Sequence, residues 1–194
     1  MSEVSPEADE PEVHLAGARQ GNADARAGLL RALQDPIYRF CLSQLADVDS
    51  AHDATQETAL QILRGLEGFR GDSRIKTWAL GIALNVCRQA RRQSLRHRGL
   101  GDIQRNEQLS TDAAGPSEVA VRREHDQALQ DCLQQLPDRQ REVVVLRYFE
   151  EMKIDEIAQA MNIAPGTVKA TLWQALRRLR KQFENDDATM AKVN

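Results

Sequence analysis

The sequence predicts an all-α protein built of two small helical domains joined by a flexible linker. Three observations predict this fold class. Ala, Leu, Gln, Arg and Glu dominate the chain, and this composition favours helix. Alternating runs of Val, Ile and Thr, which are typical of strands, are almost absent. A stretch rich in Gly, Ser, Thr, Asn and Asp over residues 99–117 interrupts the helical periodicity and predicts the linker.

The first half of the chain begins with a disordered acidic tail over residues 1–13, which hold five acids and two prolines. The first domain then spans residues 14–98. Apolar residues at three- and four-residue steps predict a helix over 23–45, and Pro36 is expected to kink or break it.

Two more helices are expected in the first domain. The polar stretch 47–50 precedes one of them, with Asp49 or Ser50 as its expected N-cap, and this helix runs to about Leu66. A glycine-containing turn follows, and a long helix is expected from about Ile75 to about Arg96.

The second domain is expected over residues 118–183, before a C-terminal tail over 184–194. A helical stripe ends at Pro137, and the dense apolar run 143–149 predicts a core helix. A short helix near 154–158, a turn over 162–166 and a last helix to about Phe183 then follow. Two helices joined by a tight turn, the second ending in basic residues, predict a helix-turn-helix.

The last helix is amphipathic, with a core face and a mixed polar face. At about 100° per residue, the predicted core face holds Val168, Leu172, Ala175, Leu176, Leu179 and Phe183. The opposite face carries Gly166, Ala170, Trp173 (at its margin), Gln174, Arg177 and Lys181. Small, amide and basic groups suit a reader of the DNA major groove. An ordinary helix with a solvated basic face is the alternative.

A basic cluster lies at the end of the long helix, formed by Arg88, Arg91, Arg92, Arg96 and Arg98. Cations favour a helix C-terminus, so the cluster could simply cap that helix. Five arginines exceed what capping needs, and phosphate contacts explain the excess better. Upstream, Trp78 is either a core anchor or a stacking platform for an unpaired base.

The net charge of −3 hides an uneven distribution. Residues 15–98 carry thirteen bases and eight acids, and residues 127–183 carry nine bases and seven acids. Both expected domains are therefore basic, whereas the tail and the linker are acidic. We expect those acidic segments to shield the basic faces in the free protein, which would then bind duplex DNA poorly.

Several function classes are excluded by what the sequence lacks. The three cysteines are widely spaced within apolar helical patterns and predict buried thiols, and the four histidines are isolated, so no metal site and no cofactor are expected. Asp53 and Glu57, four residues apart, predict a solvated acidic face rather than a catalytic pair. The sequence therefore indicates no enzyme. An acidic N-terminus and the lack of a long apolar run predict a cytoplasmic protein without membrane insertion.

The motifs together resemble a known family, the extracytoplasmic-function (ECF) sigma factors of bacterial RNA polymerase. The first half resembles their domain 2 through the segments 53–58 (DATQET) and 69–72 (FRGD), then Thr77-Trp78, Ile82-Ala83 and Asn85. The second half resembles their domain 4 through 136–142 (LPDRQRE), 156–158 (EIA) and 166–169 (GTVK). The resemblance covers roughly residues 15–183, and the joint occurrence of the motifs makes it specific.

The resemblance implies functions for particular residues. Asp53, Gln56 and Glu57 would dock on the largest subunit of core RNA polymerase. The long helix would engage the minus-ten promoter element, with Asn85 holding a flipped-out base beside Trp78, Arg88, Arg91 and Arg92. The last helix would read the minus-thirty-five element through Thr167, Lys169, Ala170, Trp173, Gln174 and Arg177. Core RNA polymerase, promoter DNA and an anti-sigma factor are the implied partners.

The last helix also departs from the family pattern. The family usually continues after GTVK with Ser-Arg and later Arg-Ala-Arg, whereas this chain has Ala170-Thr171 and Gln174-Ala175-Leu176. Ala164 stands where a Ser usually caps the helix, which costs about 1 kcal/mol of local stability.

Two other hypotheses were considered beside the sigma factor. One is a stand-alone helix-turn-helix regulator whose N-terminal half senses a ligand or dimerises, and the other is an enzyme with an appended DNA-binding domain. A sensor domain would show a ligand pocket and aromatic residues. This first domain instead shows an acidic face and an arginine-rich helix end.

Overall fold

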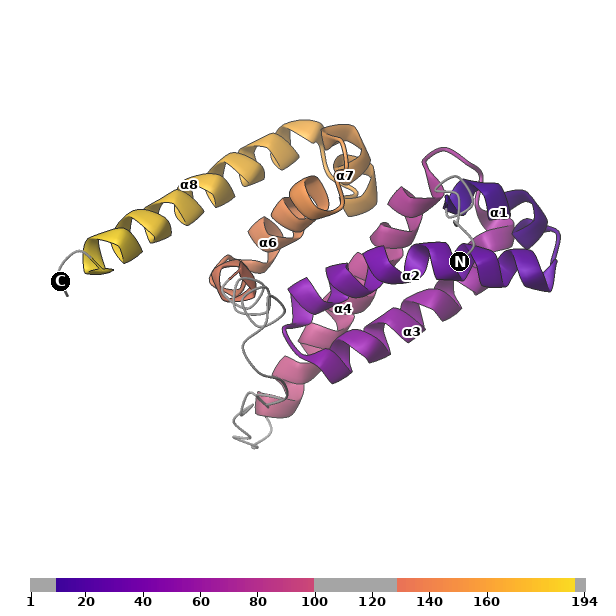
Figure 1. Ribbon diagram of the computed structural model, residues 1–194, viewed down its shortest axis with the longest axis horizontal. Helices are drawn as coiled ribbons and strands as arrows, with labels where there is room; N and C mark the ends of the chain where they lie inside the picture. Colours follow the sequence, from indigo (N-terminus) through magenta and orange to yellow (C-terminus); the bar gives the residue numbers. More distant parts are fainter. Residues whose placement is uncertain (1–9, 100–128, 191–194) are drawn as a thin grey trace, which may run out of the picture.

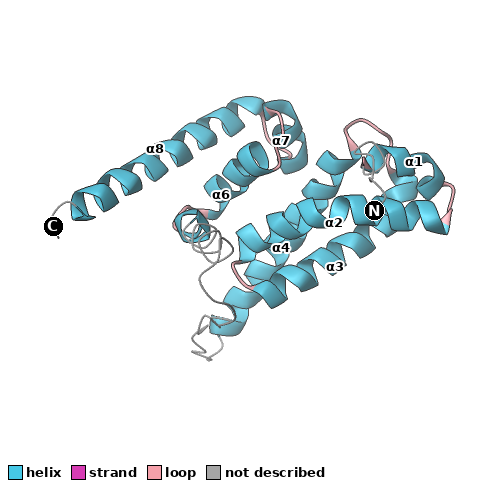
Figure 2. Ribbon diagram, in the orientation of Figure 1, coloured by secondary structure: helices cyan, strands magenta, loops and turns pink. Residues whose placement is uncertain are grey.

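The computed structural model describes residues 10–99 and 129–190, and within these ranges all regular structure is helical (Figures 1 and 2). The predicted all-α fold is confirmed. The first group of helices comprises α1 (Pro11–Arg19), α2 (Ala23–Leu45), α3 (Val48–Gly65), the short η2 (Leu66–Gly68) and α4 (Ile75–Gly99). The second group comprises a helical turn over 129–134, α6 (Asp138–Val144), η3 (Val145–Phe149), α7 (Ile154–Met161) and α8 (Pro165–Met190). The expected linker beyond Gly99 lies outside the described residues.

The first domain is a bundle of α2, α3 and α4, with α1 packed against α2 (Figure 1). Each of the three long helices contributes apolar side chains at three- and four-residue steps. They include Leu29, Leu33, Phe40, Ile62, Leu80 and Leu84, all at most 1% exposed. Burying a Leu or Phe side chain contributes about 1.5–3 kcal/mol, so this stripe accounts for much of the stability of the domain.

Three boundaries differ from the sequence-based expectation. Helix α2 runs unbroken through Pro36, with Leu33 and Ile37 buried on either side of it, so the expected break is absent. Helix α1 begins at Pro11, a position where a missing N–H removes no helical bond, so residues 11–13 are helical rather than part of a disordered tail. Helix α8 continues to Met190, so most of the expected C-terminal tail is helix.

The N-cap of α3 is Asp47 rather than Asp49 or Ser50. Its side-chain oxygen accepts a hydrogen bond of 2.8 Å from the backbone N–H of Ser50, which would otherwise lack a partner in the first helical turn. Hydrogen bonds from Ser50 lower the pKa of Asp47, because they stabilise the carboxylate.

We predict that Asp47→Ala lowers the free energy of unfolding by about 1 kcal/mol, the usual loss of an N-cap. Asp47→Asn is the matched control, because its amide oxygen can accept the same bond. Urea unfolding followed by circular dichroism measures both variants. An equal loss in both would show that the charge, and not the cap, carries the effect.

The second domain contains the predicted helix-turn-helix. Helices α7 and α8 are joined by a turn in which Asn162 adopts a left-handed conformation with φ of 53°. The N–H of Ile163 closes this turn on the carbonyl oxygen of Ala158 at 2.9 Å. Buried side chains from α6, η3, α7 and α8 form the core of the domain, among them Val143, Leu146, Ile157, Val168 and Ala175.

The two domains are in direct contact along α4. A Cβ placed on Gly81 of α4 would lie 3.4 Å from the carbonyl oxygen of Ala160 in α7, so the two helices approach closely at this point. Nearby, the fully buried carboxylate of Glu150, which follows η3, lies 3.0 Å from the Nζ of Lys76 in α4 and 3.7 Å from the Nε of Arg39 in α2. Burial raises the pKa of Glu150, although both cations oppose the shift.

We predict that the stability of the wild type falls relative to that of Glu150→Gln as pH rises above the ordinary pKa of a glutamate carboxyl group. A carboxyl group with a raised pKa binds more protons in the folded state, so its unfavourable contribution grows as pH rises above its ordinary value of 4.5. Urea unfolding of both proteins across this pH range provides the measurement. A difference that stays constant with pH would show that Glu150 has an ordinary pKa.

Candidate nucleic-acid interface

The exposed face of α3 carries the three predicted docking residues. Asp53, Gln56 and Glu57 are all exposed, whereas Ala54 and Thr58 on the other face are buried. The side chain of Gln61 donates a hydrogen bond of 2.8 Å to Glu57, one helical turn away. This geometry presents carboxylate and amide groups together on one face of a rigid helix.

The predicted site residues of helix α4 are exposed, half-buried or paired with a carboxylate. Asn85 and Arg92 are exposed. Trp78 is half-buried and packs against Phe69, with 5.2 Å between ring centroids. A Cβ on Gly65 would lie only 3.0 Å from the indole, so the ring fits because that position is glycine. Trp78 is thus a packing residue of the first domain with only part of its ring accessible.

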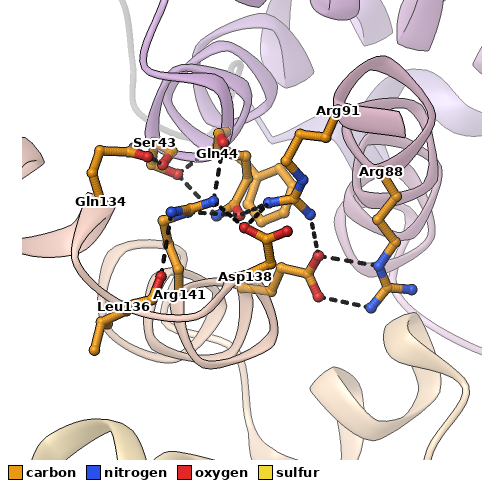
Figure 3. Close-up of polar contacts among 10 residues, drawn as sticks. Ser43, Gln44, Arg88, Arg91, Gln134, Leu136, Asp138 and Arg141 are labelled. Carbon is orange, nitrogen blue, oxygen red and sulfur yellow. Dashed lines mark hydrogen bonds and ion pairs between the residues drawn. The ribbon is translucent and has the colours of Figure 1, made fainter. Parts of the chain in front are cut away.

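Arg88 and Arg91 are engaged by a carboxylate of the second domain, Glu142 of α6 (Figure 3). Arg88 binds both oxygens of Glu142, through its Nε at 3.1 Å and its Nη2 at 2.7 Å. Arg91 donates through its Nη2 at 2.5 Å to one of the same oxygens. The residue Glu142 is only 2% exposed, so its charge is neutralised by these two guanidinium groups.

A wider polar network surrounds this carboxylate (Figure 3). The guanidinium of Arg141, buried like Glu142, donates to Asp138 at 2.6 Å and approaches the side-chain oxygen of Gln44 at 3.5 Å. Burial lowers the pKa of Arg141, and Asp138 opposes that shift. Arg91 also lies 3.3 Å from Asp138, and Gln134 donates at 2.8 Å to the backbone oxygen of Ser43.

This network was not predicted from the sequence, although one signal for it was present. Arg141 and Glu142 directly precede the apolar run 143–146, all of which is buried. A charged pair so close to a buried run needs partners, because burying unpaired charge is costly. The pattern could therefore have indicated a buried ionic contact, but not which residues would complete it.

Helix α8 exposes all six predicted contact residues, namely Thr167, Lys169, Ala170, Trp173, Gln174 and Arg177. Trp173 is 61% exposed, and the Arg177 guanidinium carbon lies 5.4 Å from the centre of its ring, a cation–π arrangement. Both residues line an open hollow of about 530 Å³ together with Gln140 of α6. The helix thus offers an indole, an amide and a guanidinium on one accessible face.

Leu176 corrects the expected core face of α8. It is 41% exposed, whereas Thr171 is buried among the core side chains. Leu176 instead lines an entirely apolar groove of about 360 Å³ in the second domain. The other lining residues are Leu129, Cys132, Leu133, Val144, Tyr148, Phe149 and Leu179. Phe183 was also assigned to the core, and its side chain lies outside the described residues.

Within the described ranges, no group of three or more His, Cys, Asp or Glu side chains could hold a metal ion. Cys41 and Cys87 are free and buried, as predicted, and Cys132 is half-buried at the apolar groove. Among the described helices, none has the length and apolar character needed to cross a bilayer.

Comparison with known proteins settles the family. Residues 29–97 match the model of sigma-70 region 2, and residues 126–179 match that of sigma-70 region 4. The chain is 33% identical over 156 residues to the ECF RNA polymerase sigma factor SigX of Bacillus subtilis, covering 76% of this chain and 78% of SigX. The protein belongs to the ECF sigma factors. SigW of the same organism is 28% identical over 174 residues, covering 86% of this chain and 93% of SigW.

Solved structures show the same fold. CnrH in complex with the cytosolic domain of CnrY superposes with a TM-score of 0.69 at 21% identity, covering 92% of this chain and 99% of CnrH. RpoE of Bartonella quintana, in complex with the anti-sigma factor NepR, gives 0.65 at 22% identity, covering 78% and 92%.

As an ECF sigma factor, the protein directs RNA polymerase to promoters and takes part in transcription initiation. It is not an enzyme, and it acts in the cytoplasm, where the polymerase works. The region 2 match in the first domain decides against the stand-alone regulator and the enzyme with an appended DNA-binding domain.

Proposed function

We propose that the exposed face of α8 reads the minus-thirty-five element of the promoter. The observation that carries this proposal is the joint exposure of Trp173, Gln174 and Arg177 on the second helix of the helix-turn-helix. An amide can pair with the edge of adenine, and an indole can contact a thymine methyl group. Lys169 and Arg177 supply charge for phosphates, and Thr167 and Ala170 allow the helix to approach closely.

We predict that Gln174→Ala relaxes discrimination at one base pair, costing about 1–3 kcal/mol on the correct site. Arg177→Ala should weaken all sites alike and flatten the salt dependence of binding, because a phosphate contact carries no sequence information. Transcription from a promoter library measures both effects. Arg31→Ala, which removes an exposed arginine of α2, is the control. An unchanged base preference in Gln174→Ala would remove that residue from the reading face.

We propose that α4 engages the minus-ten element through Asn85, Arg92, Arg88 and Arg91, with the accessible part of Trp78 beside them. Asn85 is exposed and offers both donors and an acceptor to the edge of an unstacked base. Arg92 is accessible for a phosphate. Arg88 and Arg91 become available when Glu142 leaves them.

We propose that Asp53, Gln56 and Glu57 on α3 form the docking surface for the largest subunit of core RNA polymerase. Their exposure on a single helix face supports this assignment. This face belongs to the first domain, whereas α8 belongs to the second. The first domain can therefore dock on the polymerase while the second reads DNA.

We predict that the double variant Asp53→Ala and Glu57→Ala weakens binding to core polymerase while helical content is unchanged, because both side chains lie outside the core. Pull-down of core enzyme and circular dichroism measure the two properties. The variant with Asp24→Ala and Asp35→Ala removes two exposed acids of α2 and is the charge-matched control. Wild-type recovery of core enzyme by the first variant would refute the docking assignment.

We propose that an anti-sigma factor places an apolar helix in the groove lined by Tyr148, Phe149 and Leu176. The exposed large apolar side chains of that groove support this, since such patches on soluble domains mark interaction sites. The similar folds of CnrH and RpoE were both determined with a bound partner. A charged residue in the groove, as in Leu176→Glu, should relieve inhibition by that partner in reconstituted transcription.

A further inference from the structure

The contact between Glu142 and its two arginines has the geometry of a phosphate site. A carboxylate and a phosphate present similar pairs of oxygens, and arginine binds either one through two parallel hydrogen bonds. Glu142 receives such a pair from Arg88, at 3.1 and 2.7 Å, and a further bond from Arg91. The side chains of these arginines are 29% and 16% exposed, and the donors that face Glu142 are not available to another anion while it is in place.

The side of α4 that carries Arg88 also contacts the second domain about two turns earlier, at Gly81. Gly81, Asn85 and Arg88 follow one another at steps of four and three residues and therefore share one side of the helix. Helix α7 covers this side at Gly81, where its backbone oxygen of Ala160 lies 3.4 Å from the position of a Cβ. The second domain thus contacts this side of α4 at Gly81 and at Arg88, while Asn85 between them stays exposed.

We propose that Glu142 takes the place of a DNA phosphate on Arg88 and Arg91, so that the free sigma factor closes its second domain over α4 and withholds these two arginines from DNA. This proposal rests on the proposed function, in which the two arginines contact DNA. Promoter DNA and Glu142 then compete for one site, and the closed protein binds DNA weakly.

The contact is suited to opening. The interface near Glu142 consists mainly of ion pairs and amide hydrogen bonds, with Asp138, Arg141 and Gln44 beside it. Buried ion pairs add little net stability, because the charges regain their hydration when they separate. Binding of core polymerase to the two domains can therefore pull them apart without disrupting either core.

Glu142→Gln tests the competition. The amide keeps the shape of the side chain but removes the charge that holds two guanidinium groups. We expect the free variant to have a larger radius of gyration by small-angle X-ray scattering. We also expect it to bind a fluorescein-labelled duplex of random sequence at least about tenfold more tightly, with the salt slope steeper by about one to two for two added phosphate contacts.

Glu151→Gln is the matched control, because Glu151 is exposed and makes no ion pair with any described residue. It should leave both the radius and the DNA affinity at wild-type values. A Glu142→Gln protein that remains compact, or that binds the duplex no better than Glu151→Gln, overturns the proposal.

The double variant Arg88→Ala and Arg91→Ala separates this proposal from the proposed function. Loss of promoter-dependent transcription in this variant, with no gain of DNA binding in Glu142→Gln, leaves the proposed function standing and removes only the competition. Wild-type transcription in the double variant shows instead that the arginines do not serve the promoter, and both proposals then fail at this site.

A disulfide lock tests the closed state directly. The Cβ of a cysteine at Gly81 would lie 3.8 Å from that of Ala160, the usual separation in a disulfide of about 3.8 Å. The variant with G81C and A160C is oxidised and purified before it is mixed with core polymerase, and its oxidised and reduced forms are compared with each other. We expect promoter-dependent transcription only from the reduced form, and the two single-cysteine variants control for oxidation of the native thiols. Equal transcription from the locked and the reduced forms overturns the proposal.

Discussion

The charge of Glu142 is the constraint on which the arrangement of the two domains depends. A carboxylate this deeply buried must be paired, and its partners come from a helix of the other domain. Around it, Arg141 and Asp138 fix the start of α6 against Gln44 at the end of α2. Residues 136–142, which carry a family motif, are therefore also one of the segments that attach domain 4 to domain 2, beside the contacts of Ala160 and Glu150 with α4.

Much of the fold could be predicted because the sequence signals of a helix lie within the helix itself and at its ends. Apolar residues at three- and four-residue steps predicted α2 and α8, and polar or glycine-containing turns indicated where α3 and α4 begin. The 100° projection of α8 correctly placed Trp173, Gln174 and Arg177 on its exposed side. Tertiary packing explains the misses. Helix α2 continues through Pro36, with Leu33 and Ile37 buried on either side of it, and Leu176 faces a groove that no single-helix projection can reveal.

The polar contacts between domains could not be predicted in the same way. Glu142 is separated from Arg88 and Arg91 by 54 and 51 residues, so no periodicity links them. The arginine cluster was predicted to contact phosphates, and in this structure two of its members bind a carboxylate of the same chain instead. Similarly, Asp47 caps α3 in place of Asp49 or Ser50, and residue type could not decide among them because Asp and Ser are both favoured N-caps.

The π-helical turn η3 has a consequence for how this protein can evolve. A π-helical turn contains an extra residue compared with an α-helical turn, and each residue of an α-helix rotates the chain by about 100°. Within and just after this turn, Val145 and Leu146 lie in the core, Tyr148 and Phe149 line the apolar groove, and Glu150 pairs with Lys76 of the other domain. Deletion of a single codon within residues 145–149 would rotate all that follows and change the groove and the domain contact together. A point substitution can change the apolar groove or the domain contact alone. An insertion or deletion at this turn would change both surfaces at once.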